Sequence, residues 1–203
     1  MGKTRLEAFS DGVLAIIITI MVLELKVPEG DTLAVLKPLF PTLLSYVLSF
    51  TYIGIYWNNH HHLLHTCNRV TGAVLWSNLH LLFWLSLLPF ATGWMGENHF
   101  ASLPTGMYGL VLFMAACAYT ILQKAIMHAQ GSDSLLGRAL GKDWKGKSSI
   151  ILYILGIVCA YWQPLLAQAI YAGVAIMWVI PDKRIETQLH TREASDAAPG
   201  NPR

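Results

Sequence analysis

Residues 5–28 read RLEAFSDGVLAIIITIMVLELKVP, in which charged and polar side chains directly precede a dozen mostly apolar residues. About 20 predominantly apolar residues are needed to cross a hydrocarbon core roughly 30 Å thick. Asp11 lies where the apolar run begins, and an ionisable group at membrane depth is costly unless it faces protein or water and has a partner. We therefore predict a membrane-spanning helix over residues 6–25, with Asp11 facing inward.

The rest of the chain continues this pattern. Of its 203 residues, 54% are hydrophobic and only 13% are charged, whereas roughly a quarter of the residues in a soluble domain are charged. Six segments approach the length and apolarity of a span: 6–25, 39–59, 72–94, 105–127, 148–162 and 165–180. The prediction is an all-α integral membrane protein with six transmembrane helices per chain, without a soluble domain or a nucleic-acid-binding motif.

The connections between these segments carry local signals. Pro164 lies between the last two short segments and predicts a tight turn that makes them a helical hairpin. A Pro-punctuated stretch after the first span is expected to hold a short interfacial helix on the outer side. We expect helix breaks to lie in the connecting loops. Residues 1–182 would form the transmembrane domain, and the polar tail 183–203 would be cytoplasmic and disordered.

The distribution of basic residues predicts the orientation, because Lys and Arg accumulate in short loops that remain cytoplasmic. With the amino terminus inside, only Lys26 and Lys37 of the 14 Lys and Arg residues fall in outer segments. Both termini are therefore predicted to be cytoplasmic in a multi-pass protein of a bacterial-type cell membrane.

The first helix carries a stripe of large apolar side chains. Ile16, Ile20 and Leu23 follow i, i+4, i+7 spacing and fall on one face at about 100° per residue, with Thr19 beside them. By itself, such a stripe is also typical of a lipid-facing or helix-packing surface. The charged residues before it are equally typical of a helix end anchored at the membrane interface.

The start of this helix resembles a known family. Arg5, Phe9, Ser10 and Asp11 spell R-x-x-x-F-S-D, followed by AIIIT, which is similar to the signature of the endosomal/lysosomal potassium channel family, transmembrane protein 175. The chain has one copy of this motif and so resembles the prokaryotic single-repeat members, which assemble as tetramers. The resemblance implies a potassium-permeable cation channel in a homotetramer whose pore is lined by the first helices.

The same resemblance implies roles for individual residues. Ile16, Ile20 and Leu23 would form the hydrophobic pore constriction, with Ile16 as its narrowest ring, and Thr19 would contribute to ion selectivity. Arg5, Ser10 and Asp11 would form a polar lock with neighbouring helices. Monovalent cations would be the permeant ions, membrane lipids would surround the tetramer, and no cofactor is implied.

A histidine-rich stretch, YWNNHHHLLHTCNR, lies at the end of the second predicted span, at residues 56–69. Its histidines suggest metal binding as an alternative function. His61 and His65 are spaced i, i+4, and a metal-dependent membrane enzyme would use such a cluster. In contrast, the family resemblance gives Trp57, His60 and His61 a hydrogen-bonding role that holds the first helix, with Asn78 as a further partner.

Three classes of function therefore remain: a channel, a metal-dependent enzyme and a secondary transporter. An iron-dependent membrane oxidase needs several separated histidine boxes, and this chain has only one. Secondary transporters typically have inverted repeats and broken helices at the bilayer midplane. The prediction is a passive cation channel and not an enzyme.

Overall fold

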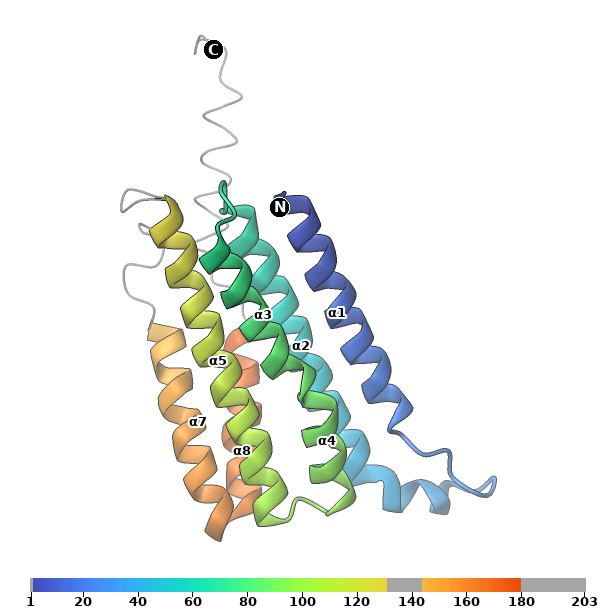
Figure 1. Cartoon of the computed structure of the whole chain (residues 1–203). Helices are drawn as coiled ribbons and strands as arrows, with labels where there is room; N and C mark the ends of the chain where they lie inside the picture. Colours follow the sequence, from blue (N-terminus) through green and yellow to red (C-terminus); the bar gives the residue numbers. More distant parts are fainter. Residues whose placement is uncertain (1, 131–143, 180–203) are drawn as a thin grey trace, which may run out of the picture.

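The computed structural model describes residues 2–130 and 144–179 (Figure 1), and all regular secondary structure in these ranges is helical. The chain forms a bundle of long, roughly parallel helices. Its elements are α1 (Lys3–Leu23), η1 (Leu33–Leu39), α2 (Phe40–His65), α3 (Gly72–Ser86), α4 (Leu88–Glu97), α5 (Ser102–Gln130), α7 (Trp144–Trp162) and α8 (Pro164–Val179). The predicted all-helical, six-span membrane fold is confirmed, with α3 and α4 together forming the third span.

The length of the helices fits a bilayer. The 21 residues of α1 extend about 31 Å at about 1.5 Å per residue, which matches the thickness of the hydrocarbon core. Within the described ranges, four helical segments are long and apolar enough to cross a membrane: Lys3–Leu23, Leu33–His65, Gly72–Glu97 and Ser102–Gln130. The shorter Pro164–Val179 is also apolar.

The third span departs from the prediction. Residues 72–94 were expected to form one uninterrupted helix, but the helix ends at Ser86 and a new one begins at Leu88. Pro89 explains the position of this break, because it lacks a backbone N–H and is tolerated only in the first turn of a helix. The expectation that breaks lie only in connecting loops is therefore wrong, and uninterrupted helices cannot be used as an argument against a transporter.

The other local signals agree with the structure. Gln163 separates α7 from α8, which pack against each other as the expected hairpin. The short helix expected after the first span is η1, a 3₁₀ helix. The predicted tail, 183–203, and the basic residues Arg138 and Lys142 lie outside the described residues.

The core of the bundle forms around α5, which packs against α3, α4, α7 and α8. Tyr171 of α8 is fully buried, and Gly109 and Gly156 make room for its ring, because a Cβ atom at either glycine would collide with it. In contrast, α1 lies at one edge of the bundle and packs against α2, α3 and α4 (Figure 1). One side of α1 is therefore left uncovered by its own chain.

Candidate functional site

The first helix has two distinct faces. Its buried residues recur every three to four positions and contact the bundle: Leu6, Ser10, Leu14, Ile17 and Met21. This spacing places them on one side of an α-helix. All are apolar except Ser10, so this serine is the one polar group that α1 inserts into the core.

Ser10 is held by a buried hydrogen-bond chain that joins three helices. Its hydroxyl accepts a hydrogen bond from Asn78 Nδ2 of α3 at 3.0 Å and donates to the Leu6 carbonyl at 2.9 Å. Asn78 Oδ1 in turn lies 2.7 Å from Nε2 of His60 on α2. Ser10 and Asn78 are fully buried and His60 is nearly so. Because buried polar groups are costly without partners, this chain ties α1 to α2 and α3 in one arrangement.

Asp11 makes a second connection to α2. The indole Nε1 of Trp57 donates a hydrogen bond to Asp11 Oδ1 at 3.0 Å. His61 is not part of the hydrogen-bond chain; its ring stacks on Trp57 with centroids 6.5 Å apart. Arg5 is exposed and makes no ion pair or hydrogen bond with any described residue. The polar contacts within one chain therefore involve Ser10 and Asp11, but not Arg5.

The sequence predicted that Asp11 faces inward, but it did not identify Trp57 as its partner. The nearby carboxylate of Glu7 lies close to Lys3, whose Nζ is 3.9 Å from Glu7 Oε1. Trp57 and Asp11 are 46 positions apart, so no local spacing pattern relates them.

The opposite face of α1 is exposed. Ile16, Ile20 and Leu23 have exposed fractions of 60%, 43% and 76%. Phe9 is also exposed, at the same face near the start of the helix. The residues of the predicted stripe therefore lie on the surface of the single chain, in a row that follows the axis of α1.

Thr19 is exposed beside this stripe. Its hydroxyl donates a hydrogen bond to the Ala15 carbonyl of the same helix at 2.9 Å. Since the hydroxyl proton is used within the helix, the lone pairs of Oγ1 remain available on the exposed side. Such an oxygen can replace part of the hydration shell of a cation.

A groove of about 650 Å³ runs between α1 and α4. Ile16 and Ile20 line it from α1, and Phe90 and Gly93 line it from α4. At the end of the bundle opposite to the amino terminus, Lys26 Nζ lies 2.6 Å from Glu97 Oε1. This hydrogen-bonded carboxylate raises the pKa of Lys26. Sequence reasoning did not pair these two residues, which α1 and α4 bring together across a separation of 71 positions.

The geometry does not support a catalytic metal centre in the described part of the chain. Among residues 2–130 and 144–179, no three His, Cys, Asp or Glu side chains are grouped so that they could hold a metal ion. Catalytic zinc sites use three protein ligands and keep one position open.

These features first define a class of protein: a multi-pass helical membrane protein whose edge helix presents an exposed apolar stripe with one hydroxyl beside it. The family model for the endosomal/lysosomal potassium channel TMEM175 matches residues 5–89, which extend from α1 into α4. A potassium channel of Chryseobacterium sp. (strain P1-3) is 57% identical over 189 residues, covering 93% of this chain and 98% of the relative. The chain therefore belongs to the TMEM175 family.

More distant relatives agree with this assignment. The crystal structure of a lysosomal potassium-selective channel TMEM175 homolog from Chamaesiphon minutus superposes with a TM-score of 0.78 at 28% identity, covering 88% of this chain and 96% of that one. The human endosomal/lysosomal proton channel TMEM175 is 30% identical over 151 residues, which are 68% of this chain but only 29% of the human protein. This chain thus has the single-repeat length of the prokaryotic relatives. Membership of an ion-channel family confirms the prediction that it is a membrane channel protein and not an enzyme.

Proposed function

We propose that this protein is a potassium-permeable cation channel in which the exposed face of α1 lines the pore and Ile16 forms its narrowest ring. The observation that carries the proposal is the division of α1 into two faces. Ser10 and Asp11 anchor it to α2 and α3, while Ile16, Ile20 and Leu23 remain uncovered in line with each other. Large apolar side chains in a narrow pore restrict ion flow by steric narrowing and dewetting.

A single copy of this stripe cannot enclose a pathway, so the proposal includes assembly. Identical copies related by a closed rotational symmetry would bring their α1 helices around one axis. We propose a homotetramer, in keeping with the family resemblance of the motif Arg5, Phe9, Ser10 and Asp11. In such an assembly the uncovered face of each α1 meets the shared axis and not lipid.

Thr19 is the proposed contributor to selectivity. Its outward-facing oxygen lies between the levels of Ile16 and Ile20 along the helix, where it could contact a passing cation. A hydroxyl ring replaces only part of the hydration shell, so the preference for potassium should be weaker than in a filter built from backbone carbonyls.

The proposed location is the prokaryotic cell membrane, with both termini cytoplasmic. The start of α1 and the α2–α3 connection lie at one end of the bundle, and α7 begins part-way along the bundle, at the end of this helix that faces the same direction (Figure 1). Among described residues, Lys3, Arg69, Lys145 and Lys147 belong to these segments, whereas Lys26 and Lys37 belong to the opposite end. This asymmetry favours placing the amino-terminal end in the cytoplasm.

The decisive experiment is single-channel recording of Ile16→Asn in planar bilayers. If Ile16 forms the constriction, the hydrated side chain of Asn lowers the free-energy barrier to ion passage. The current should rise tenfold for about every 1.4 kcal/mol by which this barrier falls. Ile176→Asn on α8 is the matched control, because Ile176 is similarly exposed at 65% but belongs to a helix away from α1 (Figure 1). Equal currents in wild type and Ile16→Asn would contradict the assignment.

Selectivity is tested under potassium/sodium bi-ionic conditions. Thr19→Val removes the oxygen while it preserves the shape of the side chain, and should move the reversal potential toward zero without abolishing current. Thr51→Val is the control, because Thr51 of α2 makes the same kind of bond to its own helix, from Oγ1 to the Val47 carbonyl at 2.8 Å. An unchanged reversal potential in Thr19→Val would reject this role.

A further inference from the structure

The last two turns of α2 carry four histidines, and the hydrogen-bond chain around Ser10 uses only His60. His61 and His65 are both exposed. Their spacing of four places them on the same side of the helix, and their ring centroids are 6.3 Å apart. Neither imidazole hydrogen-bonds to another described residue, so its nitrogens are available to a ligand.

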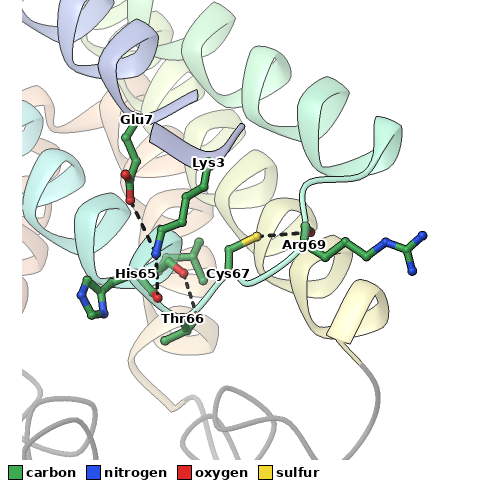
Figure 2. A network of polar contacts seen from close by, with 7 residues as sticks. Lys3, Glu7, His65, Thr66, Cys67 and Arg69 are labelled. Carbon is green, nitrogen blue, oxygen red and sulfur yellow. Dashed lines mark hydrogen bonds and ion pairs between the residues drawn. The ribbon is translucent and has the colours of Figure 1, made fainter. Parts of the chain in front are cut away.

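The surroundings of His65 leave its ring accessible. Its backbone carbonyl accepts a hydrogen bond from Lys3 Nζ at 2.9 Å, and this ammonium group lies close to the Glu7 carboxylate. Figure 2 shows the ring of His65 pointing away from the Lys3–Glu7 pair. The nearby cation is thus directed at main-chain and carboxylate oxygens and not at the imidazole.

Two histidines one helical turn apart are a recognised arrangement for transition metals. Neutral imidazole is a suitable ligand for zinc, copper and nickel ions, and a pair at i and i+4 on one helix face can bind one ion together. With two protein ligands, the remaining coordination positions are filled by water. This composition distinguishes the pair from a catalytic centre with three protein ligands.

We propose that His61 and His65 bind a divalent transition-metal ion of the nickel, copper and zinc class at the carboxy-terminal end of α2. This binding site does not depend on the ion-channel function proposed above. It does have a direct connection to α1, because the His61 ring stacks on Trp57 and Trp57 donates to Asp11. A bound ion would therefore lie next to one of the two polar contacts that anchor α1.

The test is isothermal titration calorimetry of Ni²⁺ into the detergent-purified full chain, prepared without a polyhistidine tag. Wild type should bind one saturable Ni²⁺ per chain. Loss of an outer-shell partner alone typically lowers metal affinity 10–100-fold, so removal of one ligand in His61→Ala or His65→Ala should weaken binding at least about tenfold. His128→Ala is the control, because His128 is also exposed but lies on α5.

Tryptophan fluorescence gives an independent measure of location. Bound Ni²⁺ should quench Trp57, so Trp57→Phe should reduce the amplitude of quenching while Ni²⁺ still binds in calorimetry. Unchanged affinity in both His61→Ala and His65→Ala would overturn the proposal, as would the absence of saturable binding to wild type. Each variant is first compared with wild type by circular dichroism, and a ligand variant that has lost its helical content is replaced by His61→Gln or His65→Gln.

Discussion

Replacement of Asn78 by Ala is the most direct test of how α1 is anchored. Asn78 is fully buried on α3 and bridges Ser10 of α1 and His60 of α2. The substitution removes both bonds with one side chain and leaves two buried polar groups without their partner. It also leaves the apolar stripe and the Trp57–Asp11 bond untouched.

The expected loss of stability follows from the number of bonds. Hydrogen bonds between membrane helices contribute about 0.6 kcal/mol on average and up to about 1.7 kcal/mol each. Two bonds therefore give a loss of about 1 to 3.5 kcal/mol. For a protein of this size, a loss of about 2 kcal/mol lowers the thermal midpoint by about 4–8 °C. Ser10→Ala, which removes only the bond to α1, should cost about half as much.

The assay is thermal unfolding of the detergent-purified protein, followed by circular dichroism. The double variant, compared with both single variants, isolates the Ser10–Asn78 coupling. Asn58→Ala is the matched control, because Asn58 is exposed on α2. A midpoint for Asn78→Ala equal to that of wild type, or an equal loss in Asn58→Ala, would refute the reasoning.

Two further predictions concern other contacts. Gly156→Ala should lower the thermal midpoint, because the new Cβ would overlap the ring of a buried tyrosine, at a typical overpacking cost of about 1–3 kcal/mol. The control is Gly173→Ala, which places its Cβ in open space and should be neutral or slightly stabilising. Equal midpoints for the two variants would contradict this packing. Glu97→Gln should lower the pKa of Lys26 toward its usual value, since the carboxylate raises it, and should therefore speed acylation of Lys26 at a fixed pH. Mass spectrometry would measure that rate against Lys37, which should be unaffected, and an unchanged ratio of the two rates would show that the ion pair is absent in solution.

The spans could be predicted because bilayer thickness and hydropathy act on whole segments. Runs of about 20 apolar residues locate α1, α2 and α5 without any knowledge of their contacts. The break between α3 and α4 was missed because Pro89 lies inside an apolar run, where average hydropathy hides a single residue. The signal was nevertheless present, since a proline within a helical pattern ends or kinks the helix near that position.

For the candidate site, the sequence predicted the alignment of residues within α1 but not the contacts of α1 with other helices. The i, i+4, i+7 spacing of Ile16, Ile20 and Leu23 depends only on helix geometry, so the structure necessarily aligns them. The contact of Asp11 with Trp57 and that of Lys26 with Glu97 depend on how distant helices pack, and no local period encodes such pairs. The family resemblance indicated a role for Trp57, but not which group it would bind.

The two polar contacts of α1 explain how a single helix can direct its apolar stripe. Ser10 and Asp11 are adjacent, so their side chains differ by about 100° around the helix axis, and they bond to two different helices, α3 and α2. Rotation of α1 about its axis would stretch both bonds at once, whereas a single contact would allow the helix to pivot. A rotation of one residue step would replace Ile16 by Ala15 or Ile17 on the uncovered face. Ser10 and Asp11, at the start of the span, therefore determine which side chain faces the proposed pore axis.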